Sequence, residues 1–356
     1  MYLNKTFAVK FIFFTFVSIL VYCLIFFLIY FFSVASFHAK KIQEIWPLKQ
    51  FQQEYYALGG GRKIFQNDLN CIDIDRKLIY KPKIGECIFN NIEFNTSLNF
   101  DLFGRILPDR IYSNKKLPGI AILGDSYAMG WGVNDNETFA NILQKSTKKP
   151  IFNLAVSSYA TERELKMLIF SGLLDKVDTI VIQYTTNDYI ENEKSFFFKD
   201  NYYIDQSKIF EKRINKKEIL DNNISYFLER FKYALKFPIR ELFIKFFPNS
   251  ELKIFKFSLI KSKIEDDDFN KHRDALIRIL KRYDKFLNKK KVYIFYVNPW
   301  GATFKNFPQG KDTEFNYLHY IEPKFNKTHF FLIDEHLNSK GHLHIGTFLT
   351  KALNLQ

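Results

Sequence analysis

The sequence predicts a three-layer α/β/α fold, in which a parallel sheet of about five strands lies between two layers of helices. Short apolar runs recur from Gly119 onwards, and each is followed by turn residues and then by apolar side chains at helical spacing. The runs are apolar throughout, which is typical of strands that are buried on both faces. Buried strands that alternate with helices along a chain indicate parallel pairing, so the two observations together predict the fold class.

The N-terminal segment, residues 1–35, contains an uncharged apolar run at about residues 11–35. A run of roughly twenty residues or more is long enough to cross a bilayer as a helix. A cleavable signal peptide is the alternative, because Ser33-Val34-Ala35 resembles a cleavage site. The apolar part of a signal peptide is usually much shorter, at about 7–15 residues, so we expect a retained single transmembrane helix in the inner membrane.

Charge does not decide the orientation of this helix. Lys5 and Lys10 precede the span, while Lys40, Lys41 and Lys49 follow it. We expect the soluble part to be periplasmic or otherwise extracytoplasmic.

Cysteine use gives a second indication of the compartment. Cys23 lies within the span, and Cys71 and Cys87 are the only others. This pair would suit a disulfide in an oxidising compartment, or the two could be unpaired core residues.

Residues 36–60 are mixed in composition and lead into Gly59-Gly60-Gly61, so we expect a linker there. A strand-rich segment should follow over residues 61–118. Within it, short apolar runs near residues 78–80, 87–89 and 99–101 alternate with turn residues.

The main domain should cover residues 119–356. Its expected strands are residues 120–123, 151–155, 179–184 and 291–297, and its clearest expected helices are residues 161–174 and 274–287. A helical insertion at about residues 196–270 separates the third strand from the fourth. Between Lys199 and Lys291 there are 24 Lys and Arg against 14 Asp and Glu, a difference of +10, so most of the net charge of +14 lies there.

This insertion could cover a site, lie against the membrane or be an addition to the fold. Zinc-finger spacing, RNP-like motifs and Arg-rich runs are missing from the sequence, so we expect no nucleic-acid partner. The His residues are dispersed, and neither His-Glu-x-x-His nor Cys-x-x-Cys occurs, so we expect no metal and no other cofactor.

Four loops carry polar residues directly after expected strands or near the C-terminal helix. They are Gly124-Asp125-Ser126-Tyr127, residues 153–158, Thr186-Asn187-Asp188, and Asp334-Glu335-His336-Leu337-Asn338. In a parallel sheet such loops gather at one edge, where ligands bind. Together they supply a nucleophile, hydrogen-bond donors and a His with a nearby carboxylate. These are the groups that acyl-transfer catalysis requires.

These blocks resemble, in order, the Gly-Asp-Ser, Gly, Gly-x-Asn-Asp and Asp-x-x-His blocks of the SGNH or GDSL hydrolase family. The resemblance covers about residues 99–350, and its most specific parts are AILGDSYAMGWGV and DEHLNSKGH. The second is similar to the ending of membrane-associated relatives that handle acyl groups on surface polysaccharides. The resemblance does not extend to the basic insertion.

The resemblance implies that Ser126 is the nucleophile, that His336 is its general base and that Asp334 orients His336. It also implies an oxyanion hole made by the backbone N–H groups of Ser126 and Ser158 and by the side-chain amide of Asn187. The implied activity is that of a serine esterase or O-acetyltransferase acting on an ester-linked acyl group of an extracytoplasmic glycan. Whether water or a sugar hydroxyl resolves the acyl-enzyme stays open.

The sequence departs from the family pattern at three positions. Ser158 and Thr186 stand where the family has Gly, which narrows the pocket and favours a small acyl group such as acetyl. Asp334 stands two residues before His336 instead of three. These departures leave one alternative, a catalytically weak glycan-binding or assembly protein on the same fold. The basic insertion leaves another, a cytosolic-facing lipid esterase at the membrane surface, which would need the opposite topology. Trp131 and Trp300 could stack on a sugar or be buried, and His342 is expected to pack in the core.

Overall fold

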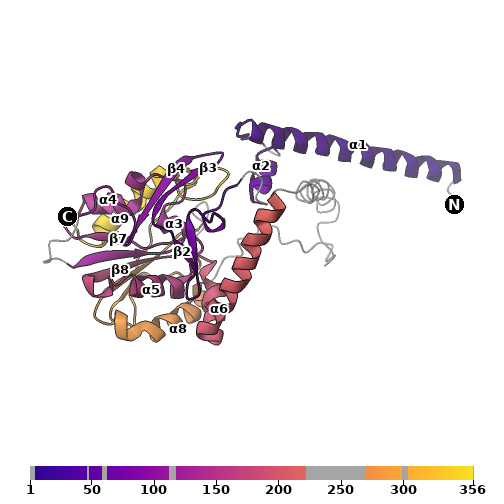
Figure 1. The fold of residues 1–356 in the computed structure, drawn as a ribbon. Helices are drawn as coiled ribbons and strands as arrows, with labels where there is room; N and C mark the ends of the chain where they lie inside the picture. Colours follow the sequence, from indigo (N-terminus) through magenta and orange to yellow (C-terminus); the bar gives the residue numbers. More distant parts are fainter. Residues whose placement is uncertain are drawn as a thin grey trace. The chain divides into compact units, whose positions relative to one another are not determined.

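The computed structural model describes residues 5–45, 48–57, 62–111, 118–221, 269–298 and 304–355 (Figure 1). Its contacts divide the chain into two compact units. The first combines Met1–Gly61 with Asn215–Ser262, and the second combines Arg62–Ile214 with Lys263–Gln356.

The first unit contains the apolar helix that the sequence predicts. Helix α1 covers Lys5–His38. Its 26-residue stretch Phe13–His38 contains an 18-residue window with a mean hydropathy of 2.6, so it is long and apolar enough to cross a membrane. Part of the expected linker forms a second helix, α2 (Leu48–Ala57). The side-chain amide of Gln52 on α2 donates to the carbonyls of Ser33 and Lys41, at 3.2 and 2.8 Å, and this ties α2 to the end of α1.

Within the described residues, the second unit is built on a nine-stranded sheet with the order β10-β11-β9-β8-β6-β7-β5-β4-β3. The strands are β3 (Gly85–Asn90), β4 (Asn95–Asp101), β5 (Gly104–Arg105), β6 (Gly119–Leu123), β7 (Ile151–Asn153), β8 (Val177–Tyr184), β9 (Lys291–Tyr296), β10 (Gly310–Lys311) and β11 (Leu318–Tyr320). A separate antiparallel pair is formed by β1 (Ile72–Asp75) and β2 (Ile79–Pro82).

The five strands β11, β9, β8, β6 and β7 are parallel to one another, which confirms the predicted parallel sheet. Strands β3, β4 and β5 extend this same sheet in antiparallel fashion, with Arg105 of β5 paired to Asn153 of β7. The strand-rich segment before the main domain therefore completes the main sheet.

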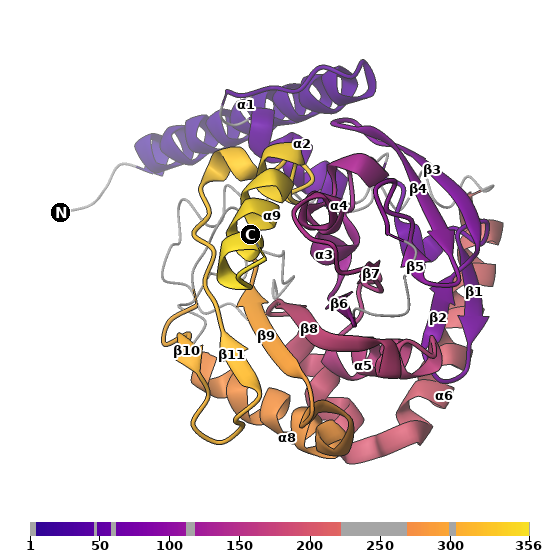
Figure 2. The same ribbon diagram turned by 90° about the vertical axis from the view of Figure 1, so that its left-hand side faces the viewer.

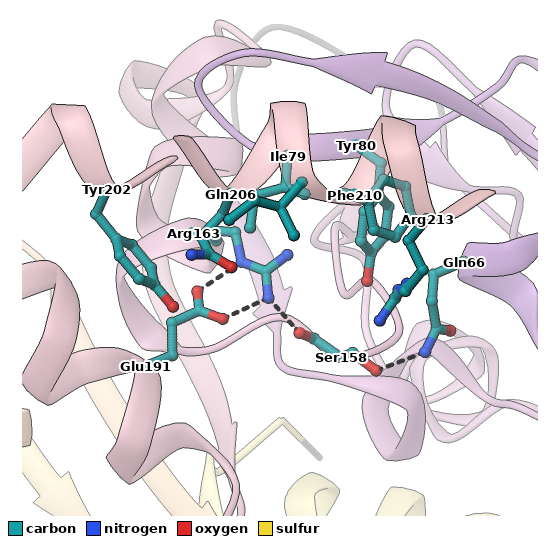
Figure 3. A pocket seen from close by; sticks show the side chains of 11 residues that line it. Gln66, Ile79, Tyr80, Ser158, Arg163, Glu191, Tyr202, Gln206, Phe210 and Arg213 are labelled. Carbon is teal, nitrogen blue, oxygen red and sulfur yellow. Dashed lines mark hydrogen bonds and ion pairs between the residues drawn. The ribbon is translucent and has the colours of Figure 1, made fainter. Parts of the chain in front are cut away.

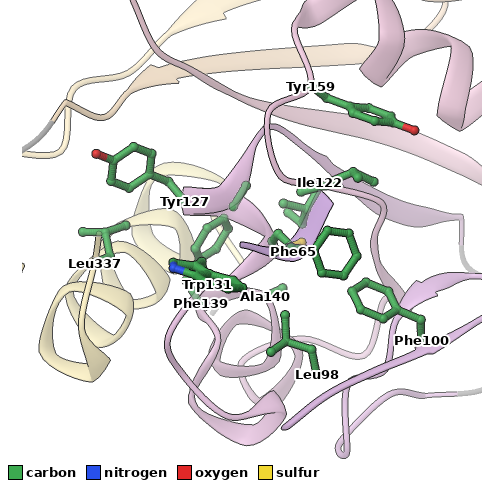
Figure 4. Packing of buried hydrophobic residues seen from close by; sticks show 14 of the residues in the cluster. Phe65, Leu98, Phe100, Ile122, Tyr127, Trp131, Phe139, Ala140, Tyr159 and Leu337 are labelled. Atoms are coloured by element: carbon green, nitrogen blue, oxygen red, sulfur yellow. The ribbon is translucent and has the colours of Figure 1, made fainter. Parts of the chain in front are cut away.

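Helices cover both faces of the sheet, as Figure 2 shows. Alternate residues of β6 face opposite clusters: Ile120 and Ile122 pack with α4 and α9, while Ala121 and Leu123 pack with α5 and α8. Figure 4 shows the first of these clusters, in which Phe139, Trp131 and Leu337 are buried together. The helices are α3 (Ser126–Met129), α4 (Phe139–Lys145), α5 (Thr161–Phe170), α6 (Asp188–Asp221), α8 (Phe269–Leu287) and α9 (Ser339–Ala352), with single turns η1 (Phe65–Asn67), η2 (Asp135–Glu137), η3 (Leu174–Lys176) and η6 (Lys327–His329).

The predicted insertion begins inside a helix. Helix α6 starts at Asp188, directly after the loop that follows β8, and runs through the start of the expected insertion. Residues 222–268, which make up most of the insertion, lie outside the described residues.

Cys71 and Cys87 are both buried as free thiols. The neighbouring Cys87, together with burial, raises the pKa of the Cys71 thiol above its usual value. The two cysteines are therefore neighbours in the fold, one just before β1 and the other in β3.

Candidate active site

A sharp turn after β6 presents Ser126 at the carboxyl end of the sheet. Gly124 has a φ of 149°, and a Cβ there would lie 2.7 Å from Oε1 of Gln183, so only glycine fits. Asp125 caps the short helix α3, because its Oδ1 accepts the N–H of Tyr127 at 2.9 Å. Gln183 holds the turn from β8, since its Oε1 accepts the Asp125 N–H at 3.2 Å.

Ser126, His336 and Asp334 form a hydrogen-bonded chain. Ser126 Oγ lies 2.7 Å from His336 Nε2, and His336 Nδ1 lies 2.5 Å from Asp334 Oδ1. The Asp334 side chain is fully buried, while His336 keeps 14% of its side chain exposed. The spacing of two residues between Asp334 and His336 is therefore compatible with contact between the two side chains. This order matches the roles predicted for the three groups, which are nucleophile, base and orienting carboxylate.

A short hairpin-like loop carries the base and the carboxylate. Phe330 and Leu337 form an antiparallel bridge, and the Phe331 N–H donates to the His336 carbonyl at 2.8 Å. Glu335 has a φ of 69°, so the backbone between Asp334 and His336 turns through the left-handed region. This turn allows both side chains to face the same direction.

Glu93, in the connection between β3 and β4, holds this loop from outside. Its Oε1 accepts the Leu332 N–H at 2.6 Å, and its Oε2 accepts the N–H groups of Ile333 and Asp334, both at 2.7 Å. Burial raises the pKa of Glu93 above its ordinary value, while the three backbone donors act in the opposite direction. One carboxylate thus satisfies three consecutive backbone donors of the loop.

Two aromatic side chains fix the catalytic loop further. The ring of Tyr127 lies 4.8 Å from the ring of His336, centroid to centroid, and so limits its rotation. Trp131 is buried, and its indole N–H lies 3.4 Å from Asp334 Oδ2. Trp131 therefore belongs to the core behind the site, whereas Trp300 lies outside the described residues.

The loop after β7 brings Ser158 to the same edge of the sheet. Ser158 has a φ of 59°, a left-handed conformation that suits the glycine usual at this position in the family. Its hydroxyl accepts the side-chain amide of Gln66 at 3.0 Å, and its carbonyl accepts the guanidinium of Arg163. Among the described residues, the backbone N–H groups of Ser158 and Ser126 meet no acceptor, so both remain available to a ligand.

Asn187 lies in the loop after β8, and its side chain is exposed. Its amide oxygen accepts the hydroxyl of Thr185, and its Nδ2 lies 3.4 Å from Asp125 Oδ2. The amide N–H group is thus directed to the turn that carries Ser126. The structure brings the predicted donor to the nucleophile's turn, in contact with the carboxylate that precedes Ser126.

Two ionisable groups near the loop have shifted pKa values. Burial raises the pKa of Glu335 to about 7, although the neighbouring His336 acts against this shift. Burial lowers the pKa of His342 to about 3, because the imidazole is completely enclosed. The ring of His342 stacks on Phe139, so this His packs in the core, as expected.

Glu93 and Gln183 are site residues that the sequence does not reveal. Neither lies in one of the four strand-end blocks, and a Glu in a turn or a Gln within a strand has many other uses. Among the described residues, no group of three or more His, Cys, Asp and Glu side chains could hold a metal ion.

The chain matches no family model and no curated protein. Solved structures that are similar to it include the following two. A lipolytic protein of the G-D-S-L family from Desulfitobacterium hafniense shares 7% identity and a TM-score of 0.33, over 65% of this chain and 98% of that one. A carbohydrate esterase family 2 enzyme from Corynascus thermopiles shares 12% identity and a TM-score of 0.35, over 70% and 68%. Both TM-scores lie below 0.5, so function has to be inferred from the site's own residues.

Proposed function

We propose that this chain is a serine esterase or O-acyltransferase of the SGNH type, which cleaves an ester through an acyl-serine intermediate. The observation that carries the proposal is the chain of two hydrogen bonds from Ser126 Oγ through His336 to Asp334, at 2.7 and 2.5 Å. It joins a serine at the carboxyl end of β6 to a base that lies 210 residues further along the chain.

In the first half of the reaction, His336 Nε2 takes the proton of Ser126 Oγ as the oxygen attacks the ester carbonyl. The positive charge that forms on the imidazole is stabilised by Asp334, which accepts from Nδ1. The carbonyl oxygen becomes an oxyanion, and the free N–H groups of Ser126 and Ser158 are its nearest candidate donors, with the Asn187 amide as a third. His336 then gives its proton to the departing alcohol.

In the second half, water or a sugar hydroxyl attacks the acyl-serine, and His336 accepts the proton of this nucleophile. As the bond between the acyl carbon and Ser126 Oγ breaks, His336 returns the proton to Oγ, which restores the free enzyme. Hydrolysis and transfer use the same base and the same donors, because both pass through the same kind of tetrahedral intermediate. The choice between them depends on which acceptor occupies the site.

We infer that the acyl group is small, most simply acetyl, and that it is carried by an extracytoplasmic glycan. The small group rests on the family pattern, because Ser158 and Thr186 stand where the family has Gly and each adds a side chain. Helix α1 supports attachment to the membrane. The extracytoplasmic side of the catalytic unit is part of the proposal. The resemblance of residues 334–342 to membrane-associated relatives supports the glycan.

The test is hydrolysis of p-nitrophenyl acetate by the detergent-solubilised full-length chain. We expect Ser126→Ala and His336→Ala each to reduce the rate at least about 1,000-fold. Ser339→Ala is the matched control, because Ser339 is exposed at the start of α9. Equal rates for the wild type and Ser126→Ala would overturn the proposal.

A further inference from the structure

A small cavity opens beside Ser158, between β2, α5 and the first part of α6 (Figure 3). Its volume is about 270 Å³, just under the range of about 300–1,000 Å³ that is typical of pockets for drug-sized ligands. It therefore suits a single ring with its substituents. Its lining includes Gln66, Tyr80, Arg163, Glu191, Phe210 and Arg213.

Arg163 lies at the base of this cavity and keeps one donor group free. Its side chain is 3% exposed. Glu191 accepts from Arg163 Nε and Nη2, both at 2.6 Å, and the Ser158 carbonyl accepts from Nη2 as well. Arg163 Nη1 is buried and has no acceptor among the described residues. A buried guanidinium N–H without a partner is costly, so the cavity is built to receive an acceptor from a ligand.

Arg213 brings a second positive charge to the same cavity. It extends from α6, its guanidinium lies 5.1 Å from the centre of the Phe210 ring, and it forms no ion pair within the part of the chain that the structure describes. Figure 3 shows Arg163 and Arg213 directed into one space. Two guanidinium groups thus face one carboxylate, that of Glu191, which Arg163 already engages. The lining carries one positive charge that a ligand can neutralise.

Two aromatic rings line the cavity beside the guanidinium groups, and the Arg163 guanidinium lies 5.6 Å from the centre of the Tyr80 ring. The rings of Tyr80 and Phe210 are stacked, with centroids 5.0 Å apart and planes inclined by 24°. The side-chain amide of Gln66 also lines the cavity; it donates to the Ser158 hydroxyl and accepts the Ser157 hydroxyl, both at 3.0 Å, and its second N–H can donate to a ligand hydroxyl. An aromatic surface beside planar amides suits a sugar, which has a C–H face and a rim of hydroxyls. The free guanidinium charge adds a preference for an acidic substituent.

Ser158 connects this cavity to the catalytic site. Its hydroxyl and carbonyl are held by Gln66 and Arg163 from the cavity side, while its N–H remains free. A ligand bound to Arg163 would therefore be bound to a side chain that itself contacts Ser158, the residue with the proposed oxyanion donor. A sugar in the cavity would contact Ser158, the residue that carries one of the proposed oxyanion donors.

We propose that the cavity is a subsite for a carboxylate-bearing sugar unit of the substrate, recognised by Arg163 Nη1 and Arg213. Its place in catalysis rests on the proposed esterase function, whereas its binding chemistry does not. A planar carboxylate matches the fork of a guanidinium, and such charge-assisted bonds are stronger than neutral ones. The predicted substrate is therefore an acylated acidic glycan.

The test measures the binding of methyl glucuronide, methyl glucoside and glucose 6-phosphate to the full-length chain in detergent. Ligand-observed NMR titration gives the three affinities. We expect the glucuronide to bind about tenfold more tightly than the glucoside, and Arg213→Gln to remove most of this difference. Lys208→Gln is the matched control, because Lys208 lies on the same helix, is exposed and pairs with Asp205. It should preserve the tenfold preference.

Equal affinities of the wild type for glucuronide and glucoside would overturn the proposal, and so would a preference that survives in Arg213→Gln. Tighter binding of the sugar phosphate than of the glucuronide would overturn the assignment to a carboxylate. If the chain hydrolyses p-nitrophenyl acetate but shows no preference for the glucuronide, the proposed subsite is wrong and the proposed esterase function stands. If the chain prefers the glucuronide but hydrolyses no ester, the proposed esterase function is wrong and the proposed binding site stands.

Discussion

The carboxylate of Glu93 accepts the backbone N–H of Asp334 at 2.7 Å, and so a residue of the connection between β3 and β4 sets the position of the acid that orients His336. Glu93 accepts two further N–H groups of the same loop. The distance between Asp334 and His336 is thus controlled from outside the loop. A substitution at Glu93 is expected to change catalysis without removing any reacting group.

We predict that Glu93→Gln lowers kcat for p-nitrophenyl acetate about tenfold, with little change in KM. Glutamine has one acceptor oxygen, so it cannot satisfy the three N–H groups that the carboxylate satisfies, and a small displacement of the base lowers the rate. Steady-state kinetics of the full-length chain measures kcat and KM separately. Glu86→Gln, on the exposed side of β3, is the control and should behave as wild type. Equal kcat values for the two variants would exclude a positioning role.

Asn187→Ala tests the third proposed oxyanion donor. Removal of one such donor typically costs about 100- to 1,000-fold in rate, and we expect a loss of kcat in this range because the donor acts on transition-state charge. The KM should change little. Asn136→Ala removes an exposed amide elsewhere and serves as the comparison. A loss below threefold for Asn187→Ala would mean that the two backbone N–H groups suffice.

The pH dependence of stability should report Glu335. The pKa of this carboxyl is raised to about 7 in the folded chain, from about 4.3 in an unfolded one. The folded state therefore binds the proton more tightly, so the contribution of Glu335 is fully present below the unfolded pKa and is lost as the pH rises through about 7. Glu335→Gln removes this titration.

Thermal melts of wild type and Glu335→Gln between pH 4 and pH 8 measure the contribution of Glu335 to stability. The difference in Tm, wild type minus variant, should be greatest at the acid end and should decrease towards pH 8. A difference that stays constant over this range would contradict the raised pKa.

Substitution of Arg105 tests the buried contacts that follow helix α3. Its fully buried guanidinium donates to Asp135 at 2.8 Å and to the carbonyls of Met129, Gly130 and Val133 at 2.6–2.7 Å. Arg105→Ala leaves the Asp135 carboxylate without its counter-charge, and breaking a buried pair in this way costs about 3–5 kcal/mol. The free energy of unfolding from urea titration measures the loss. The double variant Arg105→Met/Asp135→Leu should recover part of it, and a double variant less stable than Arg105→Ala would refute this account.

Cys71 and Cys87 test the proposed location of the catalytic unit. They are buried neighbours, and we expect them to be joined as a disulfide when this unit is exported to an oxidising compartment. Maleimide-polyethylene glycol labelling of the denatured, unreduced chain should then modify only Cys23, and reduction should raise the number of labels to three. Three labels without reduction would place the unit on the reducing side or exclude the bond.

The catalytic loops and the parallel core could be predicted because their signals are local. An apolar run such as that of β6 is recognisable by itself, and the blocks around Ser126 and His336 have defined spacing. Strand β11 was not identified in the sequence, since its three residues, Leu318–Tyr320, are too few to establish a pattern. The short strand β5 joins the main sheet through a single pairing of Arg105 with Asn153, and such a contact depends on the tertiary fold.

The supporting residues were unpredictable for a related reason. Glu93 and the Leu332–Asp334 backbone meet only after more than two hundred residues have folded between them, and nothing in the neighbouring sequence of Glu93 indicates its partner. Arg163 likewise reads as an ordinary helix residue of α5. Its importance follows from burial and from the one N–H group that has no acceptor in the described part of the chain.

The separation of Ser126 from His336 by 210 residues also has a consequence for biosynthesis. At a translation speed of about 5–20 residues per second, roughly 10 to 40 s pass between synthesis of the serine and synthesis of its base. Throughout that interval the nascent polypeptide carries a serine that nothing deprotonates. Under the proposed function, the chain therefore cannot cleave esters until the loop with His336 has been synthesised and has folded against Ser126.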